Sequence, residues 1–193
     1  MITLSNGEKK LLDDLKKSNY ETYFHCLRVK KLTMKLLEHM NSDGATDYSH
    51  KDIDIICKGA LFHDIGKLYV KNVVLTKKST LSDEEKGDMR NHTIFGYNAI
   101  KDELTDDEQE IIKNIILYHH DRVDGLGYNN IKDVPLYVQI VSVCDVFDAV
   151  HTDRIYRPGL KTPACLQLIR DGKSGQFDEN IIRYLTQVTC DIE

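Results

Sequence analysis

The chain has 193 residues, of which 41% are hydrophobic and 30% are charged, and its formal net charge is −5. A chain of this length can bury one sizeable core, so we expect a single domain. The acidic balance argues against binding of a nucleic-acid polymer, and no apolar run approaches the roughly 20 residues that cross a bilayer. The charged, amphipathic start lacks the apolar core of a secretory signal, and we expect a cytoplasmic protein.

Helical periodicity dominates the first half of the chain. Apolar residues recur three to five positions apart between Tyr20 and Met40, which predicts a helix. A further helix is expected to start at Asp47-Tyr48-Ser49, to run into Phe62-His63-Asp64, and to be interrupted near Gly66. Farther along, Ser82 and Glu85 have the spacing of a helix-starting capping box.

The second half contains one segment that could be a helix or a strand. Thr105 is predicted to cap a helix that ends at His119-His120, before a loop rich in Gly and Asn. The β-branched run in residues 134–150 would suit a buried strand. Pro135 suits a helix opening, however, and Val138, Val141 and Asp145 fall on one helical face, so we predict a helix. The expected fold is therefore an all-α, single-domain helical bundle.

Histidines and carboxylates cluster near the ends of these predicted helices or within apolar sequence. The candidates are Glu21, His25, His63, Asp64, His92, His119, His120, Asp145 and Asp148. Each one alone is more often a helix cap or a satisfied polar group than a ligand. Several buried ionisable groups in one small fold need partners, however, and a metal cluster supplies them together. Nitrogen and oxygen donors without thiolates suit iron or manganese as well as zinc.

Two longer motifs carry a resemblance to a known family. The segment ALFHDIGKL (60–68) resembles the signature of HD-domain phosphohydrolases. HHDRVDGLGY (119–128) resembles the second signature of the HD-GYP subfamily, which breaks down cyclic di-GMP. Further matches follow in the family's order: HCLRV (25–29), HTIFG (92–96), VCDVFDAV (143–150), DRIYR (153–157) and GQFD (175–178). The ordered set covers nearly the whole chain from Glu21 onward and is far more specific than the His-Asp pair alone.

The resemblance implies a site that holds two or three divalent metal ions, with iron or manganese favoured. Its implied ligands are Glu21, His25, His63, Asp64, His92, His119, His120 and Asp145. Asp64 would bridge two ions, while Glu21 and His25 match the extra pair of family members that hold a third metal. Asp148 would support the ligand shell.

The resemblance also implies contacts to substrate. Lys67 would contact the scissile phosphate, Arg154 and Arg157 would hold phosphate oxygens, and Tyr128 would line the nucleotide pocket. From spacing alone, Lys67 is as well explained as a charge at a helix C-terminus, and the two arginines as solvated surface.

The sequence departs from the family pattern at two positions. The family's Gly-Tyr-Pro reads Gly127-Tyr128-Asn129, and the acid after the His-His pair is Asp121 where Glu is common. Asn can adopt backbone conformations that Pro cannot, so we expect this loop to differ in shape from that of the family. The difference would affect substrate recognition more than metal binding.

The domain organisation follows from the same resemblance. We expect an N-terminal helix in residues 1–18 and a catalytic core in residues 19–193. We expect no separate regulatory domain, although a receiver or sensor domain is often fused in this family. Regulation is therefore expected to come from elsewhere or from a protein partner.

The leading functional hypothesis is hydrolysis of cyclic di-GMP to linear pGpG, and to GMP if a third metal binds, by a hydroxide that bridges two metals. One alternative is an HD-type phosphohydrolase for another cyclic dinucleotide or nucleotide. Others are a non-catalytic nucleotide-binding relative and a redox di-iron enzyme, although Lys67, Arg154 and Arg157 favour phosphate chemistry over dioxygen chemistry.

Overall fold

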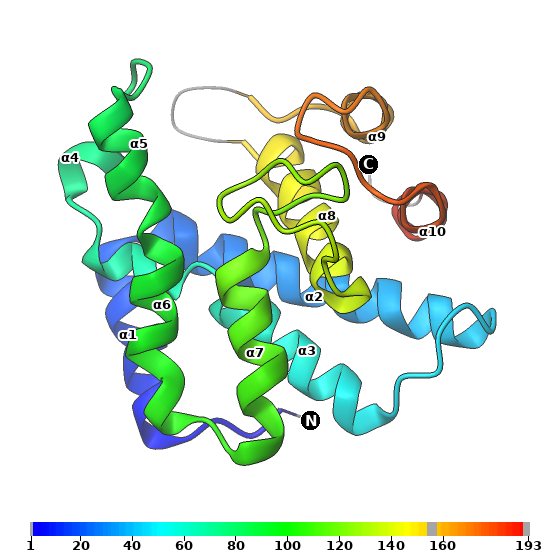
Figure 1. Ribbon diagram of the computed structural model, residues 1–193, viewed down its shortest axis with the longest axis horizontal. Coiled ribbons are helices and arrows are strands. Elements are labelled where there is room, and N and C mark those ends of the chain that lie inside the picture. Colours follow the sequence, from blue (N-terminus) through cyan, green and yellow to red (C-terminus); the bar gives the residue numbers. More distant parts are fainter. Residues whose placement is uncertain (1, 154–157, 191–193) are drawn as a thin grey trace.

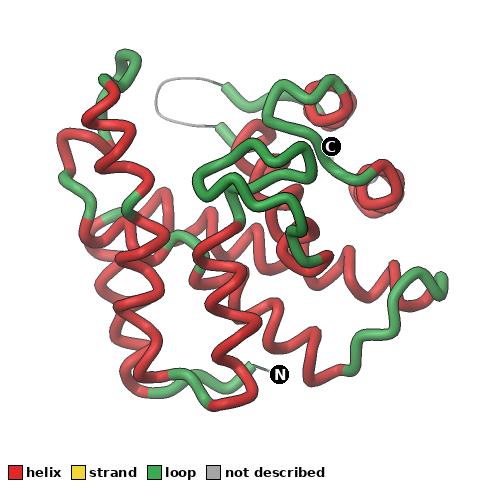
Figure 2. The backbone as a smooth tube through the Cα atoms, viewed as in Figure 1, coloured by secondary structure: helices red, strands yellow, loops and turns green. Residues whose placement is uncertain are grey.

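The computed structural model describes residues 2–153 and 158–190, and within these ranges the regular structure is helical, with no β-strand (Figure 2). The predicted all-α, single-domain fold is confirmed. In chain order the elements are α1 (Asn6–Ser18), α2 (Tyr20–Ser42), α3 (His50–Phe62), the 3-10 helix η1 (Ile65–Tyr69), α4 (Asn72–Leu75), α5 (Asp83–Arg90), α6 (His92–Ile100), the 3-10 helix η2 (Lys101–Glu103), α7 (Asp106–Tyr118), α8 (Leu136–His151), α9 (Thr162–Arg170) and α10 (Glu179–Thr189).

Capping boxes start four of these helices, because a hydroxyl side chain and an acid three residues later satisfy each other's free backbone N–H groups. The caps are Ser5 for α1, Ser49 for α3, Ser82 for α5 and Thr105 for α7. The caps at Ser82 and Thr105 were predicted, and both are confirmed.

The ambiguous segment 134–150 forms α8, as predicted, and begins just after Pro135. Val138 and Val141 are fully buried in the core, and Asp145 is buried on the same face. The segment is helical although its β-branched composition would suit a strand. The helical period places Asp145 on the same buried face as Val138 and Val141.

The predicted helix interruption near Gly66 is also present, and it positions His92 relative to the His63-Asp64 pair. α3 ends at Phe62 and the chain continues into η1. A Cβ on Gly66 would lie 1.8 Å from the backbone oxygen of His92 and 2.4 Å from the backbone nitrogen of Gly96. Glycine thus lets η1 lie directly against α6, which brings His92 beside the His63-Asp64 pair.

α2 is the longest helix, and it extends across much of the molecule (Figure 1). Its apolar residues contribute to two hydrophobic clusters. Leu36 packs in a cluster with α8, α9 and α10, whereas Cys26 packs in a second cluster with α1, η1 and α7. In the described part of the chain, no helix combines the length and apolar character needed to cross a membrane.

Candidate metal centre

Five helices bring the predicted ligands together. His25 comes from α2, His63 and Asp64 follow α3, His92 begins α6, His119 and His120 follow α7, and Asp145 lies within α8. All are buried except His120, which is partly exposed. Residues separated by 120 positions in the sequence therefore share one interior site.

Asp64 lies between two sets of imidazoles. Its Oδ2 atom is 3.7 Å from Nε2 of His25 and 3.6 Å from Nε2 of His63. Its Oδ1 atom is 3.3 Å from Nε2 of His92 and 4.0 Å from Nε2 of His119. Each carboxylate oxygen thus faces a different pair of histidines, which is the arrangement that a carboxylate bridging two ions requires.

Three of the histidines are held in the same way, with Nδ1 donating to a backbone carbonyl. His63 donates to Ala60 at 2.8 Å, and His92 donates to Met89 at 2.6 Å. His119 donates to two carbonyl oxygens in the last turn of α7, at 3.0 and 3.1 Å. Anchoring of Nδ1 fixes the tautomer and directs the Nε2 lone pair into the site, as in protein metal centres.

The Nε2 atoms of these three rings point toward Asp64 and toward one another. Nε2 of His63 is buried without a hydrogen-bond partner among the described residues. Nε2 of His92 and Nε2 of His119 lie 3.3 Å apart. Since both rings donate through Nδ1, two acceptors face each other, an arrangement that a cation between them would stabilise.

The ionisation of these groups also suits a divalent cation. Burial lowers the pKa of His92 and of His119, and burial together with the charge on His92 lowers the pKa of His120 to about 3. Burial opposes ionisation of Asp64, but Lys67 and His63 hold the pKa of this carboxyl well below its usual range. Burial also opposes the charged form of His25 and of His63, but the nearby carboxylates raise the pKa of both. His92, His119 and His120 are therefore neutral imidazoles beside a carboxylate, which are donors that iron, manganese and zinc accept.

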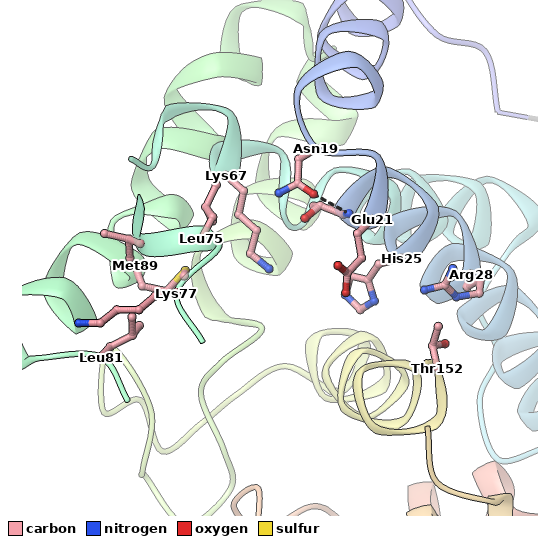
Figure 3. A pocket seen from close by; sticks show the side chains of 12 residues that line it. Asn19, Glu21, His25, Arg28, Lys67, Leu75, Lys77, Leu81, Met89 and Thr152 are labelled. Atoms are coloured by element: carbon pink, nitrogen blue, oxygen red, sulfur yellow. Dashed lines mark hydrogen bonds between the residues drawn. The ribbon is translucent and has the colours of Figure 1, made fainter. Parts of the chain in front are cut away.

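Three overlapping groups of donors could each hold an ion. They are His92 with His119 and His120, His25 with His63 and Asp145, and His63 with Asp64 and His119. The third group shares His63 and His119 with the other two and places Asp64 between them. Glu21 belongs to none of these groups, and instead lines the adjacent cavity together with His25 and Lys67 (Figure 3).

His25 is oriented by a carboxylate that is itself held by an arginine. His25 Nδ1 donates to Asp148 Oδ2 at 2.7 Å, and Nε2 lies 2.9 Å from Asp145 Oδ1. Arg28 binds both oxygens of Asp148, at 2.7 and 3.0 Å. Asp148, which was expected to support the ligand shell, therefore contacts His25 directly. Sequence reasoning missed Arg28, although its place one helical turn after His25 was an available signal.

Lys67 lies beside Asp64, with Nζ 2.5 Å from Oδ2. It lines two adjoining cavities, one with Glu21 and Arg28 and the other with His120 and Asp145. A positive charge is therefore fixed at the junction of the two cavities, next to the proposed bridging carboxylate.

The two departures from the family pattern contact each other. The backbone N–H of Asn129 donates to Asp121 Oδ1 at 2.9 Å, and its side-chain amide donates to Asp121 Oδ2 at 2.8 Å. Proline could make neither bond. Asp121 and Asn129 therefore close the loop after His120 as a pair, and the Tyr128 ring inside it lies 4.4 Å from the His120 ring.

Replacement of Asn129 by proline is expected to destabilise the protein by about 2–3 kcal/mol, since the buried Asp121 carboxylate would lose two close donors. Asn129→Ala keeps the backbone N–H and should cost roughly half as much. Urea denaturation of the two variants and the wild type measures both effects. Equal stability of the proline variant and the wild type would show that the pair does not hold the loop.

Two further residues that sequence reasoning missed support this loop. The buried Arg122 donates to the carbonyl of His119 at 2.9 Å and to Ser142 Oγ at 2.6 Å. Ser142 in turn donates to the same carbonyl of His119. An arginine in a loop gives no sequence signal of burial, so the supporting role of Arg122 could be recognised only from the tertiary structure.

The expected phosphate ligands Arg154 and Arg157 lie outside the described residues.

Comparison with known proteins identifies the family. The HD domain family matches residues 22–150, and the chain belongs to this family. A cyclic di-GMP phosphodiesterase of Vibrio cholerae is 29% identical over 84% of this chain and 35% of its own length. The 3'3'-cGAMP-specific phosphodiesterase 2 of the same organism is 26% identical over 97% of this chain and 36% of its own length. The predicted resemblance to the HD-GYP subfamily is confirmed.

A solved structure shows the same fold. An HDG"Y"P protein from Bdellovibrio bacteriovorus superposes with a TM-score of 0.67 at 21% identity, covering 87% of this chain and 52% of its own. The present chain spans about a third of the length of the curated relatives it matches.

Proposed function

We propose that this chain is a metal-dependent phosphodiesterase that hydrolyses cyclic di-GMP to linear pGpG. The observation that carries the proposal is the position of Asp64, whose two oxygens face separate pairs of histidines. Curated relatives named cyclic di-GMP phosphodiesterases support the choice of substrate.

Divalent ions, when bound, would lower the pKa of a water and neutralise charge on the phosphoryl oxygens. His63, His92, His119, His120 and Asp145 would hold these ions with Asp64, and iron or manganese is the proposed occupant. The chain's own residues would hold and orient the substrate. Lys67 would bind a non-bridging oxygen of the scissile phosphate, since it lies beside Asp64 and lines both cavities.

The remaining site residues are proposed from the resemblance. Glu21 would join His25 when a third ion is present, and cleavage would then continue to GMP. Arg154 and Arg157 would hold phosphate oxygens, for which the planar guanidinium is well shaped. Tyr128 would border the nucleotide, since its ring lies against His120 and below the Arg90 guanidinium, 5.3 Å away.

A second candidate substrate is 3'3'-cGAMP, because one relative is named for specificity toward it. Incubation of the purified, manganese- or iron-loaded chain with cyclic di-GMP, 3'3'-cGAMP and cyclic di-AMP, followed by chromatography of the products, tests both. We expect pGpG to be the main product from cyclic di-GMP. Cleavage of 3'3'-cGAMP alone would transfer the proposal to that substrate, and no cleavage of any of the three would contradict it.

A further inference from the structure

One cavity of the molecule combines a polar side and an apolar side. It has a volume of about 250 Å³ and adjoins the cavity of the metal centre, because His25 and Lys67 line both. Glu21 and Arg28 lie on the polar side. In Figure 3, Leu75, Leu81 and Met89 gather on the other side, and Lys67 extends between the two. We call the side formed by Val74, Leu75, Leu81 and Met89 the apolar wall.

The apolar wall comes from a part of the chain that supplies none of the metal donors grouped around Asp64. Val74 and Leu75 lie in α4, Leu81 precedes α5, and Met89 lies in its last turn. Val74 is buried, whereas the other three are partly exposed and so present apolar surface to the cavity.

Two ion pairs hold the wall together. Lys71 binds Asp88 at 3.0 Å and Lys77 binds Glu85 at 2.5 Å, so that each joins the α4 side of the wall to α5. Lys77 itself lines the cavity. Ser82 also caps α5 immediately after Leu81.

We propose that the apolar wall is the binding site for a purine base of the substrate. A ligand of this cavity must be anionic at the Lys67 end and apolar at the wall, and a nucleotide has both properties. Aliphatic and thioether side chains pack well against the faces of flat aromatic rings. This inference rests on the proposed function, since it assumes that the scissile phosphate lies beside Lys67.

The wall would bind a base by contact with its faces rather than by reading its edges. The four wall side chains carry no hydrogen-bonding group except the weakly accepting sulfur of Met89. Lys77 lies among them in Figure 3, but its ammonium is bound by Glu85. Contact of this kind is worth a similar amount for guanine and for adenine. The wall therefore contributes to affinity for cyclic di-GMP and for 3'3'-cGAMP alike.

Calorimetric binding of cyclic di-GMP and 3'3'-cGAMP to an Asp64→Ala variant tests the inference without turnover. Introduction of Leu81→Ala or Met89→Ala into this background should each raise both Kd values about five- to tenfold. Leu136→Ala removes a leucine that is 38% exposed at the start of α8, away from the cavity lining, and should leave both values unchanged.

Unchanged Kd values for both dinucleotides in both wall variants would overturn the inference. A weakening for only one dinucleotide would overturn the claim of binding by ring contact. Failure of the proposed function is read separately, from whether the wild-type chain hydrolyses cyclic di-GMP. Circular dichroism of each variant confirms that it is folded.

Discussion

Replacement of Asp64 by alanine is expected to reduce turnover of cyclic di-GMP by at least about a thousandfold. The carboxylate is the only group in the described site that faces His25 and His63 with one oxygen and His92 and His119 with the other. Its loss would remove a donor from both proposed ions and leave Lys67 without its partner. Initial rates and metal content of the purified variant measure the two effects together.

Two controls separate loss of chemistry from loss of fold. Asp64→Asn keeps the size of the side chain but carries one oxygen instead of two, and is expected to be nearly as inactive as Asp64→Ala. Asp102→Ala removes an exposed carboxylate in η2 and should retain wild-type rates and metal content. Normal turnover by Asp64→Ala would rule out the bridging role.

A methyl group added at Gly66 is expected to destabilise the protein by at least about 3 kcal/mol. The new Cβ would lie 1.8 Å from the backbone oxygen of His92, and backbone cannot move aside as a flexible side chain can. η1 and α6 would have to separate, which would also move His92 away from Asp64. We therefore expect Gly66→Ala to lower both the urea midpoint and the metal content.

Gly87→Ala provides the matched control for that substitution. Gly87 lies within α5, and a Cβ added there would point into open space, with no atom from outside its own helical turn within 4 Å. Alanine also has the higher helix propensity, and the variant should gain about 0.5–1 kcal/mol. If Gly66→Ala and Gly87→Ala shifted the urea midpoint equally, close packing of η1 on α6 would not be the reason why residue 66 is glycine.

Much of the fold could be predicted from local patterns. The capping box at Ser82, the helix cap at Thr105 and the period that makes 134–150 a helix are short-range signals, and the structure contains all three. The break near Gly66 could be predicted, but its cause could not. The reason for glycine there is the backbone of α6, which no local pattern places beside it.

The candidate site, like the fold, could be predicted in part from local motifs, while the rest depends on tertiary contacts. The order of His63-Asp64, His119-His120 and Asp145 led to a correct expectation that these side chains lie together. The pairing of Asp121 with Asn129 was not predicted, because each was interpreted as a separate departure from the family pattern. Their hydrogen bonds depend on how the loop folds back, which the residue types alone do not determine.

The most direct test of the central claim is elemental analysis of the purified wild-type chain, combined with chromatography of its products from cyclic di-GMP. Under the proposed function we expect at least two iron or manganese ions per chain, since Asp64 faces two separate sets of donors, and we expect formation of pGpG. A chain that binds no divalent metal when either ion is supplied, or that leaves cyclic di-GMP intact when loaded, would contradict it.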